Sequence, residues 1–115
     1  MLYMLMIADV EKEQLGPRDP GFEELMAEYQ AFGELVEKLG VMRAGHRLQP
    51  TATATTVRVR DGKTLTTDGP FVETKEQFGG YYLLDCKDLD QAIELAGKIP
   101  SAKHGSIEIR PVWCN

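Results

Sequence analysis

The spacing of apolar residues along this chain alternates between a strand-like and a helix-like period. A short uninterrupted apolar run at residues 2–7, and a stretch at residues 80–86 that lacks polar alternation, predict strands that are apolar on both faces. Between residues 22 and 39, apolar side chains recur every three or four positions with glutamates between them, which predicts an amphipathic helix. Gly40 follows at a position where helices commonly end. The pattern therefore predicts a chain that mixes helices and strands.

The remaining elements are predicted from turn and capping signals. A second helix is expected to begin at Asp88, a good N-cap residue, and to end at Pro100. Alternating residues on both sides of the Asp61-Gly62 pair predict a β-hairpin. Two further strands are expected at residues 41–48 and 106–113.

The order of these elements indicates a fold class. Without the hairpin, the order is strand, helix, strand, strand, helix, strand, which predicts a ferredoxin-like antiparallel sheet with two helices on one face. Two helices cover one side of a sheet, yet residues 2–7 and 81–84 are apolar on both sides. We therefore expect a homodimer whose two sheets face each other and leave a cleft, with the extra β-hairpin extending one end of the sheet.

Length and charge narrow the class of protein. A chain of 115 residues forms one domain, so residues 1–115 are treated as a single unit. The net charge of −5, with no cluster of lysine and arginine, disfavours nucleic acid and anionic membranes as partners. The opening apolar run lacks the basic flank of a targeting segment, and no segment reaches the roughly 20 apolar residues of a membrane span. We expect a soluble, cytoplasmic protein.

Motifs for metals and cofactors are missing from the sequence. The two histidines and two cysteines lie far apart and lack ligand spacing, so we expect no metal site. The cysteine usage favours reduced thiols over a disulfide. The chain also lacks a phosphate-binding glycine loop, a dinucleotide fingerprint and a serine nucleophile motif, so we expect no cofactor. Acid–base chemistry is the enzymatic class that the sequence leaves open.

The stretch DGPFVETKEQFGG, residues 68–80, is the main functional candidate. Asp68 with the Gly-Pro pair after it is typical of a turn, while Glu73, Lys75 and Glu76 have no such explanation. Long connections without secondary structure are often functional. If this one covers the mouth of the dimer cleft, its charged side chains would face a ligand. Exposed ion pairs that brace the loop are the alternative.

Histidine is the side chain best suited to proton transfer near neutral pH, so His46 is a second candidate. If His46 and Asp68 meet across the sheet, the aspartate could orient the imidazole as a general base. A solvated surface histidine is the alternative, and His104 is the weaker candidate of the two.

The last strand carries a charged pair on one face. Glu108 and Arg110 lie two positions apart and would face the cleft if the isoleucines between and before them pack on the helices. Arg110 could then hold a carboxylate or phenolate, or it could pair with Glu108 to fix the interface. Tyr81 and Tyr82 occupy opposite faces of a neighbouring strand, so one of them lines the cleft in either register, and Tyr82 is our choice.

The motifs resemble a known family. The segment DGPFVETKEQFGGYYLL, with TATATTVRVRDGKTLTT before it and IEIRPV near the end of the chain, resembles the DGPF-type branch of the YCII-related family. The resemblance implies a dimeric α+β barrel from a small bacterial protein of unassigned function. It also implies an association with sigma factors of the extracytoplasmic-function group.

Other branches of this family place a proposed catalytic histidine near the start of the first helix and an aspartate in the loop region after it. At least part of the wider family performs dehydrochlorination-type chemistry. In this chain, residues 22–39 contain no histidine. The pair, and the reaction that depends on it, therefore do not transfer.

These observations lead to a first functional hypothesis. The chain is expected to bind a small anionic or aromatic molecule in a dimer cleft and to act as a cofactor-independent lyase or isomerase. Its expected residues are the proton acceptors Asp68 and Glu73, the anion clamps Lys75 and Arg110, the proton shuttle His46, and the substrate contacts Glu76 and Tyr82. The alternatives are a non-enzymatic accessory or ligand-sensing protein, and a protein whose loop only braces its own interface.

Overall fold

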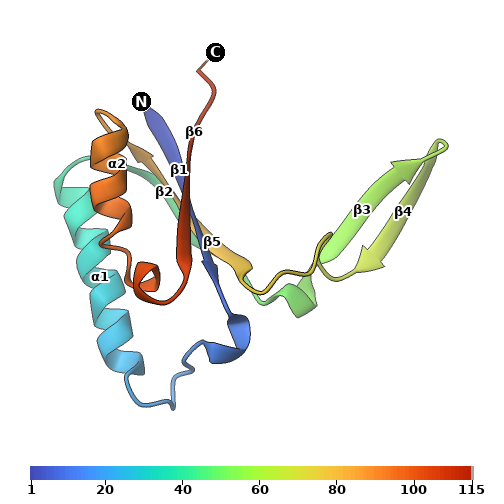
Figure 1. Cartoon of the computed structure of the whole chain (residues 1–115), viewed down its shortest axis with the longest axis horizontal. Coiled ribbons are helices and arrows are strands. Elements are labelled where there is room, and N and C mark those ends of the chain that lie inside the picture. The colour runs from blue at the N-terminus through green and yellow to red at the C-terminus, as the bar shows by residue number, and fades with distance from the viewer. Residues whose placement is uncertain (115) are drawn as a thin grey trace.

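The computed structural model describes residues 1–114, which form two helices, six strands and three short 3-10 turns (Figure 1). The strands are β1 (Leu2–Asp9), β2 (Met42–Arg47), β3 (Thr55–Arg60), β4 (Lys63–Asp68), β5 (Gln77–Asp85) and β6 (Ser106–Pro111). The helices are α1 (Phe22–Lys38) and α2 (Leu89–Ala96), and the turns are η1 (Glu11–Glu13), η2 (Thr51–Thr53) and η3 (Pro100–Lys103).

Four strands form one antiparallel sheet in the order β2-β5-β1-β6. Both helices lie on the same side of this sheet (Figure 1). Two strand–helix–strand units with this strand order make the ferredoxin-like arrangement. The predicted α+β class, the two helices on one face and the extra hairpin are therefore confirmed. None of the helices within residues 1–114 has both the length and the apolar character needed to cross a bilayer.

The helix-covered face of the sheet holds the hydrophobic core. Tyr3, Leu5 and Ile7 alternate toward it from β1, and Leu84 of β5 lies opposite Tyr3. The helices supply the buried residues Phe32, Val36, Ala92, Leu95 and Ala96. Alternation is the reason that every second residue of β1 is buried, because successive side chains of a strand point to opposite faces.

The other face of the sheet is also apolar, as the sequence predicted. Met4 lies opposite Leu83 and Met6 opposite Tyr81, and all four are partly exposed. No helix or loop of residues 1–114 lies over them (Figure 1). We call this surface the open face.

The second helix begins as predicted but ends earlier. The Asp88 carboxylate accepts a hydrogen bond from the Gln91 backbone N–H at 2.9 Å, and the Gln91 side chain accepts one from the Lys87 N–H at 2.8 Å. The prediction of Pro100 as its end is wrong, because α2 ends at Ala96 and Pro100 begins η3. Gly97 follows the last helical residue, and glycine weakens a helix because it loses more backbone freedom than other residues.

The hairpin does not extend the main sheet, which corrects the sequence prediction. Strands β3 and β4 form a separate two-stranded sheet around Asp61 and Gly62, whose φ angles of 53° and 73° suit a tight hairpin turn. Pairing between β2 and β5 stops beside the Leu48–Gly79 hydrogen bond, pairing between β1 and β5 stops at Gln77, and residues 69–76 contain no strand. The hairpin therefore projects from the body as an arm on the side away from the helices (Figure 1).

Candidate functional site

A cavity of about 620 Å³ lies between the helix-covered face of the sheet and α1. Part of its wall is apolar, with Ile7 from β1, Leu15 from the following loop, and Leu25 and Met26 from α1. Its polar wall comes from four separate parts of the chain and contains Asp9, Tyr29, Arg47, Ser101 and His104. The cavity suits a small molecule with an apolar body and polar groups at one end.

Asp9 is the buried charged residue of this cavity. It ends β1 on the covered face and is 8% exposed. Among residues 1–114, its Oδ1 is a buried side-chain oxygen without a hydrogen-bond partner. The His104 Nε2 lies 3.9 Å from this oxygen, and the His104 side chain is 61% exposed. Asp9 thus places a buried carboxyl group in the cavity wall, while the imidazole beside it reaches solvent.

A glycine allows this close packing around Asp9. A Cβ atom on Gly105 would overlap both the Asp9 Oδ1 and the Ala8 carbonyl oxygen. Any other residue at position 105 would push the segment that carries His104 away from β1. The His-Gly pair is therefore part of the geometry of the cavity.

Two tyrosine hydroxyls add proton donors to the covered side. The Tyr29 hydroxyl is hydrogen-bonded to the Ser101 hydroxyl. Burial raises the pKa of Tyr29, and its hydrogen bond to Ser101 acts in the opposite direction. Burial also raises the pKa of Tyr82, whose ring packs edge-on against Phe32 at a centroid distance of 4.9 Å. Both phenols therefore keep their protons at neutral pH.

Arg47 supplies a positive charge at the end of β2. Its charge acts on Tyr29, where it favours the phenolate and partly offsets burial. Within residues 1–114, no carboxylate lies within ion-pairing distance of Arg47. This guanidinium is therefore free to bind an anionic group.

The comparisons with known proteins identify the family of this chain. The YCII-related domain family matches residues 1–114. The chain belongs to the YCII-related family. An uncharacterised protein of Rhizobium meliloti (strain 1021) is 36% identical to it over 114 residues, which cover 97% of this chain and 92% of that relative. The resemblance found in the sequence is thus confirmed at the family level, and the activity of this YCII-related protein is argued from its site.

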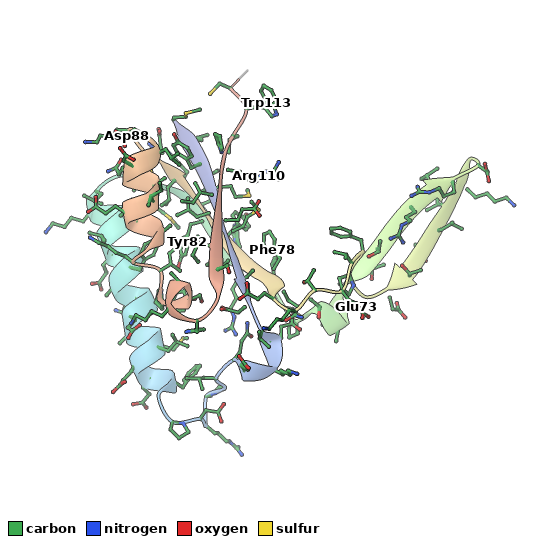
Figure 2. The ribbon with its side chains drawn as sticks, viewed as in Figure 1. Glu73, Phe78, Tyr82, Asp88, Arg110 and Trp113 are labelled. Carbon is green, nitrogen blue, oxygen red and sulfur yellow. The ribbon has the colours of Figure 1, made fainter. Side chains whose placement is uncertain are left out.

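Two of the sequence-predicted residues of this YCII-related protein, Tyr82 and His46, lie in strands that border the cavity, with their side chains on opposite faces of the sheet. Tyr82 lies on the helix side of the sheet (Figure 2), so the choice of Tyr82 for the face between two sheets is wrong, and Tyr81 is the tyrosine on the open face. His46 lies at the edge strand, opposite Tyr81 in register, and its ring is 5.7 Å from the Tyr81 ring. Because Tyr81 belongs to the open face, the exposed His46 imidazole also lies on that face of the sheet, whereas Asp9 is buried on the helix-covered face.

The other predicted residues lie away from the cavity. Asp68 pairs with Thr55 in the separate two-stranded sheet, so it does not orient His46 within one subunit. Glu73 is exposed in the loop at the base of the hairpin (Figure 2), and Lys75 is exposed in the same loop, residues 69–76. The structure therefore does not gather the predicted acid–base set into one place within one subunit.

Glu76 and Arg110 have local partners instead. The Glu76 carboxylate accepts a hydrogen bond from the Ser106 hydroxyl at 2.8 Å. Arg110 lies on the open-face side of β6, as the sequence predicted, with its Nε 3.9 Å from the Glu108 carboxylate (Figure 2). The Glu–Arg alternative for this strand therefore describes the observed contact.

The described part of the chain contains no group of three His, Cys, Asp or Glu side chains arranged to hold a metal. Cys86 is buried, Cys114 is exposed, and both are free thiols.

Proposed function

We propose that this YCII-related protein binds a small carboxylate with an apolar body in the cavity between α1 and the sheet, and catalyses cofactor-independent proton transfer on it. The observation that supports this most is Asp9, a buried carboxyl group in the cavity wall whose Oδ1 has no hydrogen-bond partner within residues 1–114. An unsatisfied buried polar group costs about 1–3 kcal/mol, so it is uncommon without a function or a ligand.

The surroundings of Asp9 fit the role of a general base. Asp9 accepts a proton from a carbon next to a carbonyl group, and the electron pair of that C–H bond passes into the carbonyl. The Tyr29 hydroxyl, which keeps its proton, donates a hydrogen bond to the carbonyl oxygen as charge develops there. His104 lies 3.9 Å from Asp9 and is open to solvent, so it exchanges the proton with water.

The products follow from the fate of the carbanion. Return of the proton to a different carbon gives an isomer, and loss of a leaving group from the neighbouring carbon gives a lyase product. Arg47 holds the carboxylate of the substrate at the end of β2, and Leu25 and Met26 contact its apolar body. This proposal keeps the reaction class expected from the sequence but moves the chemistry from the dimer cleft to the helix side of the sheet.

Phenylpyruvate combines a carboxylate, an aromatic body and an acidic C–H bond, so it serves as the probe. We expect the protein to accelerate exchange of its methylene protons in deuterated water, followed by proton NMR. Asp9→Asn is expected to lower the catalysed rate at least about 100-fold. Asp90→Asn, on the exposed surface of α2, is the matched control and keeps the wild-type rate.

Two outcomes would contradict this assignment. A catalysed rate that survives Asp9→Asn but is lost in Glu73→Gln would move the chemistry to the hairpin loop and its dimer cleft. If no exchange occurs, benzoate titrated into labelled protein still reports binding by NMR. Benzoate shifts around Tyr29 and Arg47 without exchange would support the ligand-sensing alternative, and shifts confined to the open face would reject the cavity.

A further inference from the structure

We propose that Ser101 positions the Tyr29 hydroxyl as a proton donor to a ligand in the cavity, by donating a hydrogen bond to the Tyr29 oxygen and so leaving the tyrosine proton free. This inference rests on the proposed function and deepens it, because Tyr29 there donates a hydrogen bond to the carbonyl oxygen of the substrate. Ser101 acts through Tyr29, so it is a positioning residue.

Ser101 and Tyr29 meet from distant parts of the chain. Ser101 lies in η3, Tyr29 lies on α1, 72 positions earlier, and their hydroxyl groups are hydrogen-bonded to each other. In such a pair, either oxygen can supply the shared hydrogen. If Ser101 accepted the bond, the tyrosine proton would be held within the protein and would not reach a ligand. The direction of this hydrogen bond therefore decides whether Tyr29 can act on a substrate.

The burial of Ser101 indicates which hydroxyl group donates. Ser101 is 3% exposed, and among residues 1–114 its hydroxyl group has Tyr29 as its one hydrogen-bond partner. A buried O–H group rarely lacks an acceptor, because it would lose its hydrogen bonds to water without replacing them. The Ser101 proton therefore points at the Tyr29 oxygen. Tyr29 is only partly buried and borders the cavity, so its own proton can reach a ligand there.

A hydrogen bond from Ser101 changes Tyr29 in two ways. A bond donated to a phenol oxygen stabilises the phenolate and lowers the pKa, whereas a bond accepted from the phenol stabilises the neutral form. Burial raises the pKa of Tyr29, and the bond from Ser101 opposes this rise. A hydroxyl group that accepts one hydrogen bond is also a stronger donor of another, because the two bonds polarise each other. Ser101 thus makes Tyr29 a better donor to a carbonyl oxygen on which charge develops.

The turn that carries Ser101 is fixed to the core. Ile99, two positions before Ser101, is fully buried. The Ser101 carbonyl accepts hydrogen bonds from the backbone N–H groups of His104 at 3.3 Å and of Gly105 at 2.7 Å. Gly105 in turn packs closely against the Asp9 carboxylate. One turn therefore fixes both Ser101 and the residues around the proposed base, so the donor and the base keep a set geometry before the substrate binds.

The pKa of Tyr29 in the full chain tests the direction of the hydrogen bond. It is measured without substrate, by NMR of ring-labelled tyrosine as the pH rises, and Tyr29→Phe assigns the signal. We expect Ser101→Ala to raise the pKa of Tyr29, because the variant removes the donor that stabilises the phenolate. Ser106→Ala removes an exposed serine hydroxyl that bonds Glu76, and as the matched control it leaves this pKa unchanged. A Tyr29 pKa that falls or stays the same in Ser101→Ala would overturn the proposal.

The exchange of the phenylpyruvate methylene protons measures the catalytic consequence. We expect Ser101→Ala to lower kcat about 10-fold with KM little changed, because Tyr29 donates most strongly in the transition state. Ser101→Thr keeps a hydroxyl group and is expected to recover most of this loss, and urea denaturation checks that each variant is folded. A Ser101→Ala kcat equal to that of the wild type would reject the positioning role. If the wild type catalyses no exchange, the proposed function fails, while a raised Tyr29 pKa in Ser101→Ala would still support Ser101 as the residue that directs the Tyr29 proton.

Discussion

The two faces of the four-stranded sheet carry similar side chains but have different surroundings. On the covered face, Leu5 and Leu84 are fully buried beneath the two helices. On the open face, Met6 and Leu83 come from the same two strands and remain partly exposed. The composition of a strand therefore predicts that its faces tend to be buried, but it does not say which element covers each face.

The same comparison separates the proposed chemistry from the expected dimer. The covered face ends in a cavity with a buried carboxyl group, which suits a small ligand. The open face meets an exposed arm, which suits a protein surface. The proposed chemistry and the expected dimer can therefore fail independently, and single substitutions can address each face in turn.

The largest expected effect contrasts two neighbouring residues of β5. Leu84→Ala creates a cavity in the core and is expected to lower the free energy of unfolding by about 3 kcal/mol, measured by urea denaturation. Leu83→Ala removes the same atoms from the open face and is expected to cost less than about 1 kcal/mol in dilute protein. The Leu83→Ala cost should grow with protein concentration if a second copy covers this face. If Leu84→Ala and Leu83→Ala lowered the free energy of unfolding equally at every protein concentration, the two faces of the sheet would not differ in burial as we expect.

The next effect concerns the packing around Asp9. Gly105→Ala is expected to lower the free energy of unfolding by about 1–3 kcal/mol, because its Cβ would overlap the Asp9 carboxylate and the Ala8 backbone. Gly79→Ala is the control, since its Cβ would meet only the Gln14 side chain, at 3.8 Å. If both variants unfold at the same urea concentration, then close packing around Asp9 does not depend on position 105.

Most of the fold could be predicted from the sequence. The change from a strand-like to a helix-like spacing of apolar residues correctly predicted the position of α1. The N-cap residue Asp88 correctly predicted where α2 begins. The prediction that both faces of β1 are apolar was also correct. The direction of the hairpin was not predictable, because it depends on where main-sheet pairing stops and on hydrogen bonds such as Glu11–Thr51, between residues 40 positions apart.

The candidate site was harder to predict, because its polar residues come from four separate segments. Asp9 looked like the end of an apolar run, and Tyr29 like part of a helix core. One signal was available, since Asp9 continues the alternation of Tyr3, Leu5 and Ile7 and so belongs to the buried face. A charged residue at a strand position that faces the core indicates a functional site, because charged side chains are seldom buried without a partner. Its proximity to His104 depends on the β1–β6 register and on Gly105, which local patterns do not contain.

A smaller effect concerns the helices that cover only one face. Asp88→Ala removes the side-chain acceptor of the Gln91 N–H and is expected to cost about 1 kcal/mol, measured by urea denaturation. Asp90→Ala removes a charge from the same first turn without removing the cap, and is expected to cost only a few tenths of that amount. Equal losses would show that charge near the helix start, rather than the cap, holds α2 over the sheet.

The smallest expected effect is seen only at alkaline pH. Burial raises the pKa of Tyr82 in the folded protein, so folding favours its neutral form. The corresponding stability is complete below the pKa of an unfolded tyrosine, about 10, and is lost as the pH rises through the folded value. Tyr82→Phe keeps the edge-on contact with Phe32 and is expected to match the wild type near pH 7 but to lose less stability above pH ~10. If the wild type and Tyr82→Phe showed identical profiles of stability against pH, water would reach the Tyr82 hydroxyl on the covered face. The covered face would then be less well shielded than the burial of its side chains indicates.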